Sequence, residues 1–265
     1  MFQPLYVAAT GLSALEDEML NITNNLANAQ TVAFKQSRTE NESLYYVERS
    51  FKDMLYEAMS GNEEPPLSVA YGTGVRVAST PADFSQGSIK VTKNPLDIAV
   101  QGEGFFQFMM QDGAPVYGRA GNLHIDDQGN LVDPNGHKLD PQIVIPDGTT
   151  NVVIRQDGVV LVAVNNENEY SEIGQVNLAR FTNPAGLESM GQNLYKPTTS
   201  SGEPMIGTAS ENGFGAINQY ALEESNVEVI SEMMRMVAVQ RVFDTVTKAV
   251  QSYEGMLASL EKMKS

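Results

Sequence analysis

The stretch that decides the fold is residues 4–28, PLYVAATGLSALEDEMLNITNNLAN. Its apolar residues lie alternately three and four positions apart, the spacing of a coiled-coil seam, at Leu5, Ala8, Leu12, Leu15, Met19, Ile22 and Leu26. The same alternation returns near the other end of the chain, at Val239, Val242, Val246, Ala249, Tyr253, Met256, Leu260 and Met263. Both ends are therefore predicted to be amphipathic helices, whose narrow apolar stripes need cover from each other or from other chains.

A second apolar stripe opens the C-terminal helix, at Val227, Ile230, Met234 and Val237. It is out of phase with the stripe that starts at Val239, because its continuation would reach Arg241 and Asp244. An offset of this kind either changes the supercoil locally or turns a second face of the helix outward. We therefore expect this helix to contact two partners, and we place its start near Ser225, a residue type favoured as an N-cap.

Four asparagines in residues 21–28 stand out, because asparagine is a poor helix former. They favour two interpretations equally: side-chain amides that make contacts beyond the helix, or a fraying helix end with Asn28 as its C-cap. Residues 31–35 are expected to be extended. Residues 40–68 are expected to form a connection, with a short helix or a hairpin, that docks on a neighbour.

Residues 69–222 are predicted to be all-β. Strand-like runs recur at 75–77, 89–91, 97–100, 105–108, 143–145, 152–154 and 159–162. Glycine-bearing turns between them, which supply the positive φ angles of tight hairpins, are Asp112-Gly113, Gln128-Gly129-Asn130, Asn135-Gly136, Asp147-Gly148 and Asp157-Gly158.

The predicted fold class is thus α+β, with N- and C-terminal α-helices forming a coiled-coil-like base and a central all-β domain. The expected segments are an N-terminal helical polymerisation region (1–35), a connecting segment (36–68), an outer β domain (69–222) and a C-terminal helix (223–265).

Composition argues against several classes of function. The chain has 33 acidic and 17 basic residues, a net charge of −16, which disfavours binding to nucleic acid or to an anionic membrane. It has no cysteine, and therefore no disulfide or thiolate chemistry. No run approaches the roughly 20 apolar residues of a membrane span. The N-terminus has neither the basic region nor the continuous apolar run of a cleavable signal peptide.

The sequence nominates no catalytic, cofactor-binding or metal-binding residues. His124 and His137 lack the spacing of metal ligands. Gly102-Glu103-Gly104 lacks the third glycine of a dinucleotide loop, and residues 126–130 lack the alternating ligands of a calcium loop, so both are interpreted as turns. A secreted β-rich hydrolase or carbohydrate-binding module on a helical oligomerisation stalk stays open as an alternative, although no pair of carboxylates indicates a glycosidase.

Paired motifs stand at the two ends of the chain. The first is NNLANAQTVAFK at residues 24–35, and the second is LEESNV at 222–227, followed by Glu232-Met233, residues 240–243 (QRVF) and Met256-Leu257. With further motifs at 102–106, 117–121 and 129–132, they resemble those of the flagellar axial proteins, the rod and hook subunits of the bacterial basal body. Ala33 departs from the family, which usually has glycine there. The paired motifs argue against a phage-tail-like tube protein.

Within that family, the length and residues 176–187 and 191–195 are most similar to the distal-rod branch. The proximal rod is the close alternative, and a hook-type subunit would normally be longer. The resemblance implies a structural subunit, not an enzyme, that self-assembles through its terminal helices into a hollow shaft and transmits torque to the hook. Isolated subunits are expected to have disordered ends that order on assembly.

The partners implied are further copies of the chain, other flagellar rod subunits, the hook protein, the L- and P-ring bushing and the flagellar type III export apparatus. The implied location is the periplasm-spanning rod, reached without a cleavable signal peptide; no cofactor, nucleic acid or membrane insertion is expected. The expected assembly residues are Leu5, Leu12, Leu15, Met19, Ile22, Asn25, Leu26, Asn28, Phe34, Val227, Ile230, Met234, Val237, Gln240, Arg241, Val246, Ala249, Tyr253, Met256 and Leu260.

Overall fold

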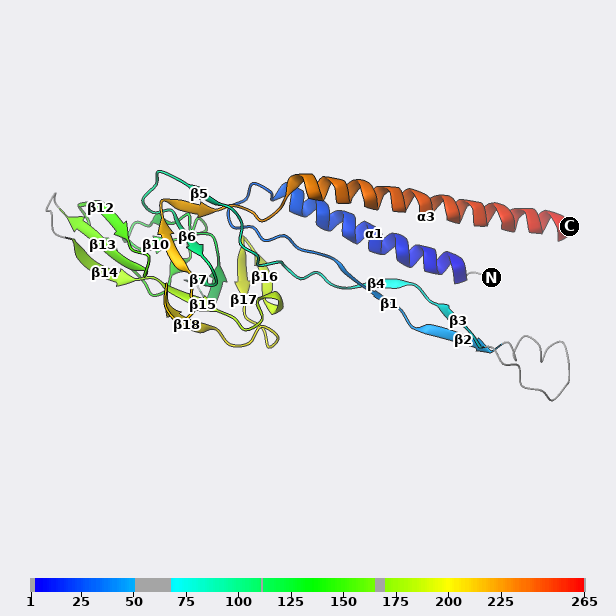
Figure 1. Cartoon of the computed structure of the whole chain (residues 1–265), viewed down its shortest axis with the longest axis horizontal. Helices are drawn as coiled ribbons and strands as arrows, with labels where there is room; N and C mark the ends of the chain where they lie inside the picture. The colour runs from blue at the N-terminus through cyan, green and yellow to red at the C-terminus, as the bar shows by residue number, and fades with distance from the viewer. Residues whose placement is uncertain (1–2, 51–67, 111, 165–169, 265) are drawn as a thin grey trace. The chain divides into compact units, whose positions relative to one another are not determined.

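A computed structural model describes residues 3–50, 68–110, 112–164 and 170–264. Helices stand at both ends of the described chain and β structure dominates between them, which confirms the predicted α+β class (Figure 1). The chain divides into two compact units. The described residues of the helical unit fall within 1–24, 37–81 and 230–265, and those of the β unit within 25–36 and 82–229.

The helical unit contains most of α1 (Gln3–Ala27) and of α3 (Val229–Lys264). Pro4 lies in the first turn of α1, where its missing N–H removes no helical hydrogen bond. The two helices lie side by side (Figure 1), and the guanidinium of Arg235 in α3 pairs with the Glu18 carboxylate of α1 at 2.9 Å. Within the described residues, neither helix is long and apolar enough to cross a membrane.

Two strand pairs complete the helical unit. β1 (Glu40–Ser43) pairs antiparallel with β4 (Val75–Ser79), and β2 (Tyr46–Ser50) with β3 (Ser68–Gly72). Thr10 of α1 contacts this ribbon, because its Oγ1 accepts a hydrogen bond from the Val75 N–H at 3.4 Å. The described part of residues 40–68 is therefore paired strand, as in the hairpin alternative; residues 51–67 lie outside the described residues.

A sheet of nine strands organises the β unit. Its main path runs in the order β16 (Glu188–Gly191), β17 (Leu194–Lys196), β8 (Pro115–Gly118), β7 (Phe105–Met109), β11 (Lys138–Leu139), β10 (Leu131–Val132) and β9 (His124–Ile125). A branch is formed by β15 (Asn177–Arg180), which pairs with β7 and with β18 (Met205–Thr208).

Three smaller sheets lie in the same unit. They are formed by β12 (Thr149–Ile154), β13 (Val159–Val164) and β14 (Ser171–Gln175), by β6 (Ile98–Gln101) with β19 (Ala216–Gln219), and by β5 (Ile89–Val91) with β20 (Ala221–Glu223). A 3-10 turn, η1 (Pro184–Gly186), links β15 to β16.

Both faces of strand β7 are buried. Successive side chains of a strand point to opposite faces, so Phe106 and Phe108 enter the main core while Phe105 packs on the other side. There its ring lies 5.3 Å from that of Phe84 and 5.7 Å from that of Phe181, both edge to face. The β unit therefore has an apolar core and, across the sheet, a separate aromatic cluster.

The predicted glycine turns are confirmed. Gly113, Gly129, Gly136, Gly148 and Gly158 have φ angles between 77° and 88°, the left-handed region that favours glycine. The Asp126 carboxylate closes one of these turns by accepting hydrogen bonds from the side chain and N–H of Asn130, and these contacts lower its pKa. The turn interpretation of residues 126–130 is thus correct.

Two strand predictions are wrong. Residues 31–33 form a turn instead of extended chain, with Ala33 at φ 54°. Residues 143–145 are not a strand, because only Val144 forms an isolated bridge, to Asn130. In both places apolar side chains suggested a strand, but the backbone makes single hydrogen bonds to other elements of the β unit, for example Ala33 N–H to Glu223 O at 2.8 Å, and forms no continuous ladder.

The predicted start of the C-terminal helix is also wrong. It begins at Val229 and not near Ser225, whose Oγ accepts a hydrogen bond from the Val227 N–H. The Asn226 side chain holds this segment out of the helix, because it accepts from the Gln36 N–H at 2.7 Å and donates to the Asp83 carbonyl at 2.8 Å.

The boundaries of the two compact units differ from those of the expected segments. Residues 25–36 belong to the β unit, because they hydrogen-bond to residues 221–227. Residues 69–81 belong to the helical unit, because strands β3 and β4 pair with β2 and β1.

Candidate assembly surfaces

One face of α3 is shielded within the helical unit. Its buried or half-buried residues alternate four and three positions apart: Glu232, Met236, Val239, Phe243, Val246, Val250, Tyr253 and Leu257. Arg235, which lies one helical turn from Glu232 and Val239, pairs with Glu18 of α1. The shielded stripe therefore faces α1, as in a two-helix seam.

The predicted stripe from Val239 coincides with this seam only in part. Val239, Val246 and Tyr253 are shielded, whereas Val242, Ala249 and Met256 are exposed along its flank. Each exposed residue lies three positions after a shielded one, so the apolar surface of α3 is wider than the seam that α1 covers.

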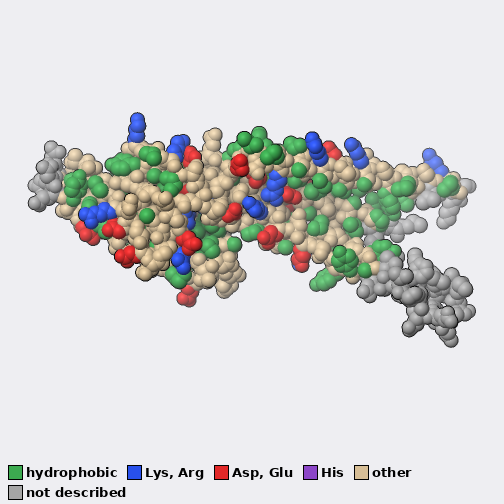
Figure 2. Space-filling model, viewed as in Figure 1, with side chains coloured by type: hydrophobic (Ala, Val, Ile, Leu, Met, Phe, Trp, Pro, Cys, Tyr) green, Lys and Arg blue, Asp and Glu red, His purple; other side chains and the backbone are tan. Residues whose placement is uncertain are grey.

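A separate apolar patch lies near the start of α3. Ile230 is 69% exposed, Met233 53%, Met234 64% and Val237 47%. With Ala238 and Arg241 they line a shallow groove, here called the outer patch. Figure 2 shows hydrophobic side chains at the surface of this unit. Burying one such side chain fully contributes about 1.5–3 kcal/mol. Contacts among the described residues leave these side chains exposed, so this free energy is available for binding a partner.

The predicted residues of α1 lie mostly on its covered side. Ile22 and Asn25 are buried, and Leu5, Leu12, Leu15, Met19 and Leu26 are half-buried. Two exposed apolar residues were missed by the seam pattern, Tyr6 at 60% and Leu20 at 69%. They are two heptads apart and share one helical position, so a search for a second stripe on α1 would have found them.

The asparagines of α1 make contacts beyond the helix. The Asn21 Oδ1 accepts a hydrogen bond from Ser37 Oγ at 3.0 Å, and Asn25 is completely buried. Asn28 follows the helix end at Ala27 and accepts from Thr31 Oγ1 at 3.1 Å. The contact of Asn21 and the burial of Asn25 favour the first of the two interpretations, whereas the position of Asn28 directly after the helix fits the C-cap of the second.

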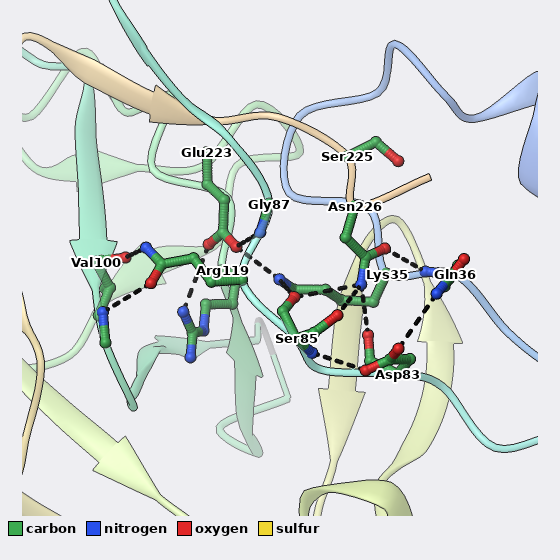
Figure 3. Close-up of polar contacts among 12 residues, drawn as sticks. Lys35, Gln36, Asp83, Ser85, Gly87, Val100, Arg119, Glu223, Ser225 and Asn226 are labelled. Atoms are coloured by element: carbon green, nitrogen blue, oxygen red, sulfur yellow. Dashed lines mark hydrogen bonds and ion pairs between the residues drawn. The ribbon is translucent and has the colours of Figure 1, made fainter. Parts of the chain in front are cut away.

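The β unit joins the two terminal motifs through a buried ion pair (Figure 3). The Lys35 ammonium donates to Glu223 Oε1 at 2.6 Å and to the Ser85 carbonyl at 2.7 Å, and both charged side chains are fully buried. The Gly87 N–H donates to the same Glu223 oxygen at 2.9 Å. Lys35 and Glu223, with Gln36, Asp83 and Asn226, are here called the terminal clamp.

Asn226 is the second connection of the terminal clamp. Besides its bonds to Gln36 and Asp83, its amide donates to Ser85 Oγ at 3.0 Å. Gln36 Nε2 also donates to Asp83 Oδ2 at 3.2 Å (Figure 3). Residues 35–36, which follow α1 in the chain, are thus held to residues 223–226, which precede α3. The side chains that connect them lie far apart in sequence.

Burial sets the electrostatics of the clamp. Loss of water lowers the pKa of Lys35, and the Glu223 carboxylate opposes that shift. Burial likewise lowers the pKa of Arg119, whose NH1 lies 3.5 Å from Glu223 Oε2. Two cations therefore share one carboxylate, and the shorter contact belongs to Lys35.

Comparison with known proteins agrees with this architecture. Residues 99–162 match the model of the flagellar hook protein FlgE/F/G D1 domain, and residues 218–263 match that of the flagellar basal body rod FlgEFG protein C-terminal region. The chain is 37% identical to the flagellar basal-body rod protein FlgG of Buchnera aphidicola subsp. Schizaphis graminum, over 99% of this chain and 100% of that protein. The chain belongs to the flagellar rod and hook protein family.

Rod proteins of several bacteria match this chain over its full length. FlgG of Bacillus subtilis is 30% identical over 100% of both chains. The flagellar hook protein FlgE of Salmonella typhimurium is 26% identical over 91% of this chain but only 56% of its own length. The predicted resemblance to the rod and hook family, with its distal-rod branch, is thereby confirmed, and the protein is a structural component of the flagellar rod.

The family motifs now have a physical meaning. Lys35 ends the N-terminal motif and Glu223 lies in the C-terminal one, and the ion pair between them could not be found from periodicity. Ala33, where the family usually has glycine, has φ 54° and is buried. A left-handed conformation is unfavourable for alanine, which explains why glycine suits this position.

The other expected assembly residues divide by exposure. Gln240 and Arg241 are exposed, like Ile230, Met234 and Val237; Asn28 and Phe34 are half-buried, and Val227 is buried. The side chain of Leu260 lies outside the described residues. Their role in assembly stays a prediction. Within the described residues, no group of three or more histidine and acidic side chains could hold a metal ion.

Proposed function

We propose that this protein is a non-catalytic subunit of the distal rod that self-assembles through its terminal helices into a hollow helical drive shaft. Its full-length similarity to FlgG proteins supports the rod assignment. The observation that carries the mechanism is the outer patch: α3 pairs with α1 through one stripe and leaves a second apolar stripe exposed. The proximal rod and the hook-type subunit are the alternative positions on the same axis.

The mechanism is mechanical. A patch that binds a different surface of a second copy makes a head-to-tail contact, which continues into a helical filament when rotation does not close a ring. Tyr6 and Leu20 of α1 offer such a second surface. Packed helical seams resist bending and twisting, because every relative movement of close-packed side chains opens voids. Torque applied at one end then reaches the hook at the other.

The proposed partners follow from this position. They are further copies of the chain, other rod subunits, the hook protein, the L- and P-ring bushing around the rod, and the flagellar type III export apparatus. The proposed location is the periplasm-spanning rod, reached without a cleavable signal peptide. We propose no enzymatic activity, so the hydrolase alternative is not retained.

Substitution of Met234 by Asp tests the mechanism. Met234 is 64% exposed, so the monomer should fold normally. In an assembled outer patch the variant would bury a carboxylate in place of an apolar side chain, at a cost of about 3 kcal/mol or more. The critical concentration for assembly, measured by sedimentation, should rise at least about a hundredfold.

Two further variants complete the test. Thr245→Asp places the same charge on an exposed polar position of α3 and should assemble within about twofold of the parent protein. Leu15→Asp should abolish assembly while the β unit stays folded, which the circular dichroism of its aromatic residues would report. Normal assembly of both Met234→Asp and Leu15→Asp would sink the proposed mechanism.

A further inference from the structure

Arg119 is a buried cation with incomplete hydrogen bonding. It is 4% exposed, and its one side-chain hydrogen bond to the described part of the chain, from NH1 to Glu223 Oε2, is long at 3.5 Å. Its Nε is buried and has no hydrogen-bond partner among the described residues. A guanidinium carries five N–H donors, and burying it without partners is costly. Such an arrangement indicates a ligand site.

The charges around Arg119 do not balance within the clamp. Glu223 gives its shortest contact to Lys35, at 2.6 Å, and the Gly87 N–H binds the same oxygen. The Arg119 guanidinium is left with the weaker share of that carboxylate and with the charge of the exposed Glu103, and its face lies over the Phe105 ring at 5.2 Å. The group that would satisfy it is an oxygen anion.

A pocket of about 330 Å³ stands beside this guanidinium. Its walls combine the rings of Phe84, Phe105 and Phe181 with a second cation, Arg180, and one carboxylate, Glu103. Arg180 is half-buried and lies 3.6 Å from Glu103, whose side chain is 74% exposed. Because Glu103 is largely in water, its charge is screened and only partly offsets the two arginines that line the pocket. The aromatic walls strengthen a charge-assisted hydrogen bond by excluding water.

We infer that this pocket, here called the arginine pocket, receives the carboxylate of an Asp or Glu side chain from a second copy of the chain. This inference rests on the proposed self-assembly. The occupant is argued from charge: the chain has 33 acidic residues and a net charge of −16, so a neighbouring copy presents many carboxylates. A planar guanidinium binds a carboxylate through two parallel hydrogen bonds, which also fixes the orientation of the incoming subunit.

Assembly of full-length variants tests the inference. Arg119→Gln removes the main ligand, and Arg180→Gln removes the half-buried one, so the second variant keeps the test valid if the first misfolds. Both should raise the critical concentration for assembly at least about tenfold, the loss expected for a charge-assisted hydrogen bond. The matched control is Arg155→Gln, an exposed arginine outside the pocket, which should assemble within about twofold of the parent protein.

A competition experiment with sodium acetate distinguishes a carboxylate of a neighbouring copy from a free carboxylate as the ligand of the pocket. At ionic strength matched with sodium chloride, acetate should compete with assembly of the parent protein and have no further effect on Arg119→Gln. If both pocket variants assemble like Arg155→Gln, the inference is overturned and the proposed rod function stands. If acetate raises the Tm of the parent monomer but not of Arg119→Gln, and assembly is unchanged, the pocket binds free carboxylates instead. Failure of the parent protein to assemble would overturn the proposed function itself.

Discussion

The β unit and the helical unit place their large apolar residues in opposite ways. In the β unit, Ile98, Phe106 and Leu178 are completely buried. In the helical unit, Leu20 and Ile230 are each 69% exposed, and its described buried apolar residues are Ala14, Ile22 and Val239. The β unit buries its core within its own chain, whereas the helical unit leaves apolar side chains exposed among the described residues. The difference separates the unit with its own apolar core from the unit that we propose assembles.

The largest expected effect is a difference in amide hydrogen exchange between the units of the monomer. Core amides of β7 exchange only through global unfolding, which typically costs 5–15 kcal/mol. Amides of α1 and α3 exchange by local opening, because two helices with one narrow seam are marginal in water. Exchange in residues 3–24 and 230–264 should be at least about ten-thousandfold faster than in β7. Strong protection of both helices in a verified monomer would contradict this comparison.

The next effect contrasts two ion pairs, one in each unit. Lys35 and Glu223 are fully buried in the β unit, whereas Arg76 and Glu42 pair at 2.9 Å in the helical unit with side chains 64% and 54% exposed. Glu223→Gln should lower the free energy of unfolding of the β unit by about 3–5 kcal/mol, because it leaves two buried cations without a carboxylate. Glu42→Gln should cost less than about 1 kcal/mol.

Urea unfolding followed by tyrosine fluorescence measures both ion-pair variants. Lys35→Met provides the reverse test, since it removes the ammonium and leaves Arg119 as the partner of Glu223, so its cost should be smaller than that of Glu223→Gln. Equal and small costs for Glu223→Gln and Glu42→Gln would show that the terminal clamp does not stabilise the β unit.

Local patterns in the sequence predicted the helices and the glycine turns, because both depend on residues that are neighbours in the chain. The seam of α1 and the turn at Gly136 are of this kind. The terminal clamp could not be predicted, because Lys35 and Glu223 meet across 188 positions and neither has a periodic pattern. The second stripe of α3 could be predicted, yet its exposure could not, since that depends on which stripe α1 selects.

A smaller effect is expected from pH in the β unit. Burial raises the pKa of Tyr195 to about 12, from about 10 in the unfolded chain. Its contribution to stability is fully present below pH 10 and is lost as the pH rises toward 12, because only the unfolded state then releases the proton. The loss is about 2–3 kcal/mol. The test measures the free energy of unfolding in urea between pH 9 and 12. The decrease over this range should be about 2–3 kcal/mol smaller in Tyr195→Phe than in the parent protein. Parallel curves would contradict the assignment.

The smallest expected effect sharpens the comparison from the side of the helices. A Cβ added at Gly11 of α1 meets no atom within 4 Å, and the same holds at Gly255 of α3. Alanine at a helix-interior position is worth up to about 1 kcal/mol over glycine, so Gly11→Ala and Gly255→Ala should each slow amide exchange of their own helix about fivefold. In the β unit, Gly121→Ala should do the opposite and destabilise the fold, because its Cβ would clash with the Ile98 carbonyl.

If Gly11→Ala stabilises α1 but raises the critical concentration for assembly, a second copy approaches closely at Gly11. If it leaves exchange unchanged, α1 is already held by its neighbours in the monomer, and the contrast between a folded unit and an assembling unit does not hold.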